Sequence, residues 1–229
     1  MAEKVIAFAG ASHTGKTLLA EDTLTYIKKE KGLNAFLVPF CGFSVLQEIV
    51  KKEGKPLQVN DYEIIFDSQV DVEKKMLEKQ GDWAIVENSL FSCYVWCFSN
   101  AIYNKVYCPE KHREIFYRMS QEARKISTRY DIIFYLPAIE NSLYAKAKKM
   151  RGWLDIEKIM QNDLILQAYA KETGISKRNS WKRIEPFEGA SCCFEGQLGA
   201  IEKIVENYCL EMRGTHKDDQ EFLDIFTKK

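Results

Sequence analysis

The sequence has no excess of charge of either sign and no long apolar run. Lysine and arginine together number 33, aspartate and glutamate also number 33, and the formal net charge at pH 7 is zero. This balance argues against a protein that coats nucleic acid or binds membranes through a polybasic surface, although it leaves room for a local basic patch. The first apolar segment, Val5 to Ala9, is far too short to cross a bilayer. We therefore expect no membrane partner.

Paired cysteine motifs are also missing. The seven cysteines are an odd number, and the sequence holds no paired C-x-x-C sets and no His-x-x-x-His spacing, so a structural zinc site is not favoured. The start of the sequence shows no secretory leader pattern. From these features we expect free thiols, a reducing compartment and a cytoplasmic location.

Short apolar segments alternate along the chain with segments of helical pattern. There is no internal repeat and no low-complexity linker, and 229 residues suit one sizeable domain. The predicted strands cover residues 4–9, 34–40, 83–87, 130–138 and 181–187. The predicted helices cover residues 17–31, 44–53, 60–80, about 90–105, about 110–128, 155–173 and 195–212. This alternation predicts an α/β, three-layer fold: a mostly parallel five-stranded sheet with helices on both faces.

Two of the predicted helices carry clear start signals. Asn60 is the expected N-cap of the helix over 60–80, and Asp155 that of the helix over 155–173. The apolar face of the first is expected to include Ile64, Ile65, Val72 and Met76. The apolar face of the second is expected to include Ile156, Ile159, Met160, Leu164 and Ala168. In a parallel sheet the ligand site lies beyond the carboxyl ends of the strands, so chemistry is expected there.

The segment after the first strand, Gly10 to Thr17, reads GASHTGKT and matches the Walker A pattern G-x-x-x-x-G-K-[ST] without a mismatch. It also lies between a strand and a helix, as that pattern requires. The glycines permit backbone angles that a Cβ atom would forbid, so successive amides point inward and form a nest for an anion. The helix N-terminus behind the loop adds positive potential. The pattern predicts a phosphate-binding loop whose cofactor-binding residues are Gly10, Ser12, His13, Thr14, Gly15, Lys16 and Thr17.

Two side chains of this loop have expected roles of their own. Lys16 is expected to reach the β- and γ-phosphates of a nucleotide, and the Thr17 hydroxyl to ligate Mg²⁺. His13 is not expected to be a metal ligand, because its backbone amide serves the loop. The expected cofactors are therefore ATP and Mg²⁺, although the sequence does not decide between adenine and guanine.

The chain resembles the P-loop NTPases, and more closely their nucleoside and nucleotide kinase group, including the nicotinamide-riboside-kinase-like ATPase (AAA-type) domain. Besides the loop, the resemblance lies in FDSQVDVEKKM (66–76), DWAIVENSLFSCYVW (82–96), YDIIFYLP (130–137) and MRGWLD (150–155). It implies a kinase-like domain over 1–213, with a lid at about 140–156 and a polar tail over 214–229. Asn88 stands where that group has an arginine, and the lid motif is reduced to Arg151.

Glu87 ends the third strand, where a carboxylate is expected either to accept the proton of an acceptor hydroxyl or to hold Mg²⁺ through water. The resemblance implies that Arg151 stabilises the moving phosphoryl group, as its planar guanidinium suits. Lys16, Glu87 and Arg151 are thus the expected catalytic residues, and Thr17 and Glu87 the expected metal residues. Asp67, Gln69 and Asn88 are the expected substrate-binding residues, although Asp67 and Gln69 are equally compatible with ordinary polar surface positions.

The favoured interpretation is an ATP- and Mg²⁺-dependent kinase acting on a hydroxyl of a nucleoside, a nucleotide or a related small molecule. Basic clusters at 146–151 and around Trp181 (177–183) leave a nucleic-acid acceptor as an alternative, but a charged, protected edge strand explains the second cluster better. A nucleotide-gated ATPase module is a further alternative. Most of the aromatic residues after Glu87 are expected to be core, although one or two could line a pocket for the acceptor base; they are Tyr94, Trp96, Phe98, Tyr103 and Tyr107. The aromatic helix pair at 90–118 could form a homodimer face.

Overall fold

The computed structural model describes residues 2–53, 56–79, 81–138, 155–178, 180–184 and 193–214. Five strands form one sheet in the order β2-β3-β1-β4-β5, and every pair of neighbouring strands is parallel. The strands are β1 (Ala2–Ala9), β2 (Ala35–Val38), β3 (Gly81–Val86), β4 (Ile132–Tyr135) and β5 (Trp181–Arg183). The predicted α/β fold with a five-stranded sheet is confirmed, and the sheet is parallel throughout.

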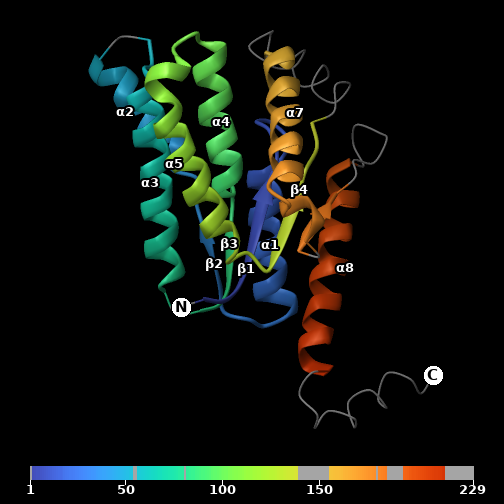
Figure 1. Ribbon diagram of the computed structural model, residues 1–229. Helices are drawn as coiled ribbons and strands as arrows, with labels where there is room; N and C mark the ends of the chain where they lie inside the picture. Colours follow the sequence, from blue (N-terminus) through green and yellow to red (C-terminus); the bar gives the residue numbers. More distant parts are fainter. Residues whose placement is uncertain are drawn as a thin grey trace, which may run out of the picture.

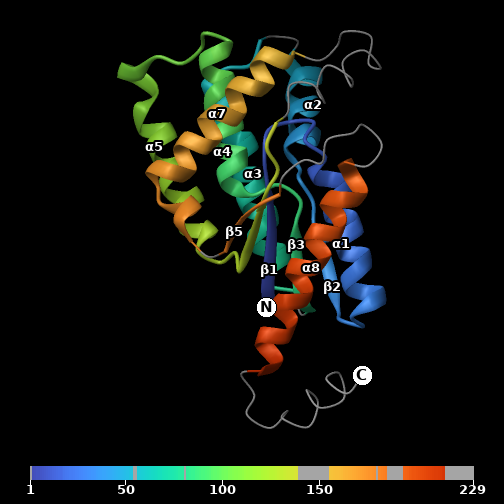
Figure 2. The same cartoon turned by 90° about the vertical axis from the view of Figure 1, so that its right-hand side faces the viewer.

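The helices cover both faces of this sheet (Figures 1 and 2). They are α1 (Lys16–Glu30), α2 (Gly42–Glu53), α3 (Val59–Leu77), α4 (Leu90–Tyr103), α5 (Pro109–Ser127), α7 (Ile156–Glu172), the short 3₁₀ helix η1 (Ile175–Lys177) and α8 (Cys193–Gly214). Figure 2 shows α1 and α8 on one side of the strands and α3, α4, α5 and α7 on the other. Each predicted helix is present, with its ends shifted by a few residues.

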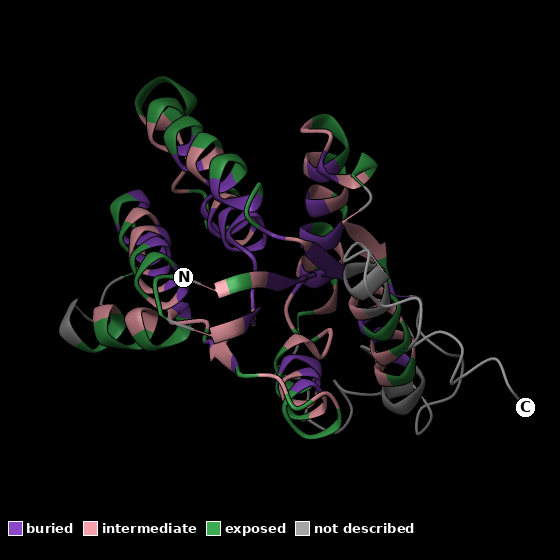
Figure 3. Ribbon diagram, turned by 90° about the horizontal axis from the view of Figure 1, so that it is seen from below, coloured by how far each residue is buried: buried purple, intermediate pink, exposed green. Residues whose placement is uncertain are grey.

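The alternation of side chains along β1 produces two cores, one on each face of the sheet. Val5, Ala7 and Ala9 belong to the larger cluster, with α3, α4, α5 and α7. Ile6 and Phe8 point to the other face and join the cluster under α1 and α8. Because both faces are covered, the strand is apolar throughout, as expected for a buried parallel strand. Figure 3 shows the same pattern as buried residues on the inner sides of the helices.

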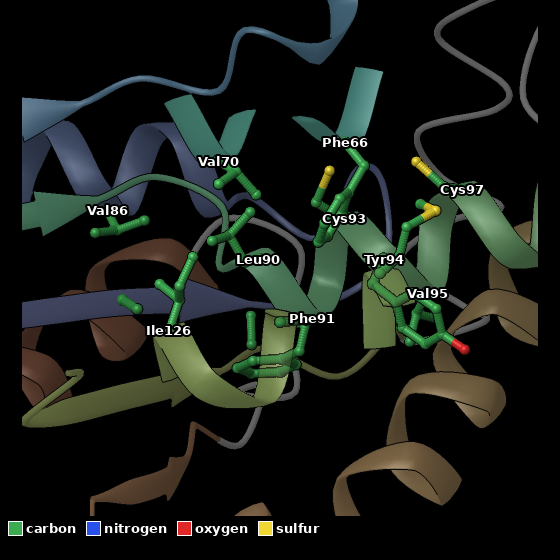
Figure 4. Close-up of a cluster of buried hydrophobic side chains, with 14 of the residues drawn as sticks. Phe66, Val70, Val86, Leu90, Phe91, Cys93, Tyr94, Val95, Cys97 and Ile126 are labelled. Carbon is green, nitrogen blue, oxygen red and sulfur yellow. The ribbon is translucent and has the colours of Figure 1, made fainter. Parts of the chain in front are cut away.

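The helix α4 lies at the centre of the larger core and is buried on several sides. Figure 4 shows Leu90, Phe91, Cys93 and Tyr94 of this helix among side chains from α3, β3 and α5. Ten of its residues are buried. Of the aromatic residues expected to be mostly core, Tyr94 is buried, Tyr103 is exposed, and the others, Trp96, Phe98 and Tyr107, are half-buried against the core. Within the described residues, no helix is both long and apolar enough to span a membrane.

Several local predictions were wrong. The third helix begins at Val59, and Asn60 is not its N-cap, because the Asp61 carboxylate accepts the hydrogen bond from the Gln58 amide at 2.6 Å and starts the helix earlier. Asp155 does cap α7, accepting from the Lys158 amide at 3.0 Å. Three residues assigned to apolar faces are exposed, namely Ile64, Leu164 and Ala168.

Candidate active site

The carboxyl ends of three central strands meet at the same level of the sheet. In the register of the strands, Ala7 of β1 lies opposite Val86 of β3, and Ala9 of β1 lies opposite Tyr135 of β4. The phosphate loop therefore leaves β1 beside the residue that follows β3, which is Glu87. Backbone hydrogen bonds extend this alignment, since the Glu87 amide donates to Val38 O at 3.0 Å and the Ser89 amide donates to Phe8 O at 2.8 Å.

The loop between β1 and α1 has the backbone that its glycines permit. Gly10 has a φ of 150°, and a Cβ atom there would lie 2.5 Å from the Leu136 carbonyl oxygen. Gly15 has a φ of 94° and stands directly before α1, and His13 also has a positive φ of 64°. The Gly10 amide donates to Ser92 Oγ at 3.3 Å, which ties the loop to α4. These features make the cradle at a helix N-terminus that binds phosphate groups in other proteins.

The Lys16 ammonium group lies over the loop. Its Nζ atom donates to the carbonyl oxygens of Gly10 at 3.0 Å and Ala11 at 2.6 Å. Both acceptors belong to the loop itself, so a positive charge stands at the concave side where an anion would enter. An ammonium group acts there as a point charge for phosphate oxygens.

Thr17 and Glu87 meet beside this lysine. The Thr17 hydroxyl donates to Glu87 Oε1 at 2.5 Å, and the other carboxylate oxygen of Glu87 accepts from the Phe40 amide at 2.9 Å. The glutamate is thus held between the first turn of α1 and the segment after β2. The described residues contain no group of three or more potential metal ligands of the His, Cys, Asp and Glu types. Mg²⁺, however, often binds one or two protein oxygens together with substrate phosphates and water. A hydroxyl and a carboxylate in contact at the phosphate loop fit that ion.

A cavity of about 350 Å³ opens at this point. One part of its lining comes from the phosphate loop and the start of α1, and Glu87, Asn88 and Ser92 also border it. The remaining walls are largely apolar and come from the segment after β2, from α4 and from α7. They are Phe40, Phe43, Val95, Trp96, Leu166 and Asn162. A cavity with apolar aromatic walls and a few polar groups is typical of small-molecule sites.

The helix α7 is fixed against the sheet by a buried carboxylate next to that cavity. The Tyr135 hydroxyl lies 2.9 Å from both carboxylate oxygens of Asp163, and Gln167 Nε2 donates to the same carboxylate at 2.9 Å. Burial raises the pKa of Asp163, although its hydrogen bonds oppose that change. Burial and the nearby carboxylate also raise the pKa of Tyr135. The network places the neighbouring residue Asn162 at the cavity wall.

The expected site residues fall into three groups. Gly10, Ser12, His13, Gly15, Lys16, Thr17, Glu87 and Asn88 border the cavity. Thr14 belongs to the same loop, where its hydroxyl donates to Ala11 O at 3.0 Å. Arg151, the lysines 146, 148 and 149, and most of the expected lid lie outside the described residues, as do residues 215–229 of the expected tail.

Asp67 and Gln69 lie on α3 and do not border the cavity. Arg118 of α5 donates to both carboxylate oxygens of Asp67 at 3.0 Å. Gln69 is fully buried, where its Oε1 accepts from the Cys41 amide at 2.9 Å and its Nε2 donates to Pro39 O at 3.3 Å. Gln69 therefore holds the segment that carries Phe40. Contact of either residue with an acceptor stays a prediction.

The basic cluster around Trp181 belongs to an edge strand. The Trp181 ring stacks on Tyr135 at a centroid distance of 5.1 Å and packs against Phe91 at 5.7 Å. Because this ring faces the core, it is not available to stack on a base. The arrangement agrees with the favoured explanation of a charged edge strand.

Sequence reasoning did not identify several residues of the cavity wall, among them Phe40, Phe43, Val95, Asn162 and Leu166. A signal for α7 was present, since Asn162 and Asp163 interrupt the apolar positions of its helical pattern. Polar residues at buried positions are uncommon and are usually satisfied or functional. Phe40 carried no comparable signal, because an aromatic residue at a strand end is an ordinary core residue.

Solved structures of kinases that act on nucleosides or nucleotides have a similar fold. A deoxyadenosine kinase from M. mycoides with bound dCMP and dCDP superposes with a TM-score of 0.61 at 16% identity, over 89% of this chain and 99% of that chain. The NadR protein in complex with NR gives a TM-score of 0.57 at 19% identity, over 90% of this chain and 50% of that chain. A thymidylate kinase from Ehrlichia chaffeensis gives 0.56 at 17% identity, over 89% and 100%.

These likenesses confirm the fold that the sequence resemblance implied. No protein-family model and no curated protein sequence matches the chain. At such low identity the structural neighbours establish the fold alone. The chemistry has to be argued from the residues of the cavity.

Proposed function

We propose that this protein is a kinase that transfers the γ-phosphoryl group of ATP to a hydroxyl group of a nucleoside- or nucleotide-like small molecule. The observation that carries the proposal is the contact between Thr17 and Glu87 at the mouth of the phosphate loop. It brings a carboxylate beside the phosphate loop, next to where the terminal phosphate of a bound nucleotide would be held. The structural neighbours are kinases of nucleosides and nucleotides, which supports the same class of reaction.

In this proposal the phosphate loop and Lys16 bind the donor. The loop amides and the ammonium group hold the phosphate oxygens and neutralise part of their charge. Thr17 and the phosphates would hold Mg²⁺, which supplies further charge neutralisation when it is bound. Arg151 keeps its expected role of stabilising the moving phosphoryl group from the lid.

Glu87 would act on the acceptor. Its carboxylate accepts the proton of the acceptor hydroxyl as the new oxygen–phosphorus bond forms and the bond to the ADP oxygen breaks. Glu87 is already oriented by Thr17 and by the Phe40 amide. Transfer of a phosphoryl group needs little covalent work from the protein, so positioning of this kind accounts for much of the rate.

The cavity wall supports a small acceptor. Its apolar and aromatic residues lie within reach of the phosphate loop in one continuous cavity of about 350 Å³. Such a volume suits a ligand of nucleoside size. The alternative of a nucleic-acid acceptor depends partly on a Trp181 ring that can stack on a base. The Trp181 ring is packed against Tyr135 instead, which weakens that alternative.

The proposal is tested by incubating the protein with ATP labelled at the γ-phosphate and a panel of nucleosides, nucleotides and oligonucleotides. We expect label to appear on a nucleoside or nucleotide. Lys16→Ala should abolish most of this transfer, whereas the matched variant of the exposed Lys28, Lys28→Ala, should retain it. Hydrolysis of ATP without any labelled acceptor would indicate an ATPase module instead. Transfer to an oligonucleotide with steep salt dependence would indicate a nucleic-acid kinase.

A further inference from the structure

Two asparagines of low exposure border the cavity and make no side-chain hydrogen bond within the part of the chain that the structure describes. Asn88 follows Glu87 and is 7% exposed, and Asn162 of α7 is 6% exposed. Both line the cavity. Neither side-chain amide makes a hydrogen bond to any other part of the chain that the structure describes.

Glu73 Oε1 is the one fully buried polar side-chain atom without a partner among the described residues, so the amides of Asn88 and Asn162 are not sealed in the core but border the cavity. A polar group in a mostly buried residue is usually paired. Another buried asparagine shows the ordinary arrangement. Asn100 of α4 is 5% exposed, and its Nδ2 donates to the Trp96 carbonyl oxygen at 2.7 Å. The contrast indicates that the amides of Asn88 and Asn162 are kept for a partner that enters the cavity.

The surroundings of the two amides indicate what that partner is. The other residues of this part of the cavity wall are apolar or aromatic. They are Phe40, Phe43, Val95, Trp96 and Leu166. Among the described residues that line the cavity, Lys16 alone is a lysine or arginine, and it belongs to the phosphate loop. Flat apolar walls suit a planar ring, and an amide offers both a donor and an acceptor to a neutral polar edge. A second phosphate would require cationic donors instead.

Both asparagines directly adjoin a residue whose carboxylate is hydrogen-bonded, which fixes the backbone at that point. Asn88 follows Glu87, whose carboxylate is fixed by Thr17 and by the Phe40 amide. Asn162 precedes Asp163, which is bound to Tyr135. A site whose polar groups are held before the ligand arrives loses less entropy on binding.

We propose that Asn88 and Asn162 bind the phosphate acceptor, and that this acceptor is an uncharged nucleoside rather than a nucleotide. The inference rests on the proposed kinase function, which it makes more specific. Asn88, beside Glu87, would bind near the reacting hydroxyl, and Asn162 would bind the base or the sugar from the side of α7.

The experiment combines binding, transfer and stability for three variants, namely Asn88→Leu, Asn162→Leu and the control Asn100→Leu. The probes are the common ribonucleosides and deoxyribonucleosides and their 5′-monophosphates, titrated calorimetrically in the presence of Mg²⁺ and saturating ADP. Wild-type protein should bind and phosphorylate at least one nucleoside and should discriminate against the matching monophosphate. Asn88→Leu and Asn162→Leu should each raise the dissociation constant of that nucleoside by about 10-fold or more, because a paired amide is lost from a buried site.

Thermal unfolding separates recognition from a merely structural role. Asn162→Leu should leave the Tm unchanged or higher, because it removes no hydrogen bond within the described residues, and should leave the affinity for ATP unchanged. Asn100→Leu should lower the Tm, because it removes a paired amide, while nucleoside affinity stays within about threefold of wild type. Unchanged nucleoside affinity in both Asn88→Leu and Asn162→Leu would overturn the proposal. It would also be overturned if Asn162→Leu lowered the Tm so far that partial unfolding explained its weaker binding.

The outcomes also distinguish this inference from the proposed function. If the wild type phosphorylates only monophosphates, the inference is overturned and the kinase function stands. If it phosphorylates none of the probes, the kinase function fails, and the titrations in ADP still decide whether the two asparagines bind a nucleoside.

Discussion

A buried carboxylate on α3 predicts that the protein becomes less stable as the pH rises toward neutrality. Glu73 is fully buried. Its Oε2 accepts a hydrogen bond from the Tyr130 hydroxyl at 3.1 Å, and its Oε1 has no hydrogen-bond partner among the described residues. Burial raises the pKa of Glu73 from 4.5 to about 7, although Tyr130 and the charge of Arg129 oppose the change. The protonated carboxyl is therefore the form that the fold prefers.

The sign and size of the effect follow from that raised pKa. Between about pH 4.5 and pH 7 the folded protein binds more protons than the unfolded chain, so the free energy of unfolding falls as the pH rises. One pKa unit corresponds to about 1.4 kcal/mol. The raised pKa of Glu73 therefore lowers the free energy of unfolding by about 3 kcal/mol above pH 7, compared with its value at low pH. Glu73→Gln keeps an acceptor for Tyr130 and carries no charge. We subtract the free energy of unfolding of wild type from that of Glu73→Gln at each pH. This difference should be about 3 kcal/mol larger at about pH 8 than at about pH 4.5.

Urea unfolding of the two proteins at several pH values measures this difference at constant ionic strength. The control is Glu122→Gln, because the ion pair of Glu122 with Lys74 lowers the pKa of that carboxyl and the pair is partly exposed. This control should show a small difference of the opposite sign. A stability difference between Glu73→Gln and wild type that does not change with pH would refute the reasoning.

The remaining predictions concern the phosphate loop and its surroundings. Lys16→Ala should lower kcat/KM by about 10²–10³-fold, the scale of losing one preorganised donor, as measured by transfer of labelled phosphate. Glu87→Gln should lower kcat by about 10²–10⁴-fold if the Glu87 carboxylate accepts the proton of the acceptor. Excess Mg²⁺ should restore the rate of this variant only if Glu87 instead serves to hold the metal. Gly10→Ala should abolish ATP binding in a fluorescence titration, since its Cβ atom would lie 2.5 Å from a backbone oxygen. Gly199→Ala, at an exposed and unobstructed site in α8, should instead raise unfolding stability by about 0.5–1 kcal/mol.

The parts of the structure that depend on local patterns could be predicted from the sequence. The apolar strands, the phosphate loop and the Asp155 cap are each encoded within a few neighbouring residues. Glu87 could be placed at the sheet edge because it directly follows an apolar strand. Its contact with Thr17 follows from the parallel register of β1 and β3.

Features that depend on contacts between distant segments could not be predicted. The sequence gives no sign that Gln69 binds the segment after β2, since that contact joins residues 28 and 30 positions apart. The buried face of α7 was misplaced for a similar reason. Its helical pattern favoured the apolar Leu164, but the structure buries Asp163, whose carboxylate accepts hydrogen bonds from the Tyr135 hydroxyl and Gln167 Nε2.

The helix start at Val59 shows how a capping box overrides a residue that favours the N-cap by type, since Gln58 is the N-cap and Asp61 is its partner three residues on. Asn60 is the better capping residue by type. Asp61, however, binds the amide of Gln58 and lengthens the helix at its start. Only the geometry of the segment decides between them, because both residues favour helix starts.

Calorimetric titration of the folded protein with ATP or GTP in the presence of Mg²⁺ tests the central claim most directly. We expect saturable binding of one purine triphosphate per chain, weakened strongly in Lys16→Ala and unchanged in Lys28→Ala. Absence of binding of either triphosphate to folded wild-type protein would contradict the account of the phosphate loop and with it the proposed kinase function.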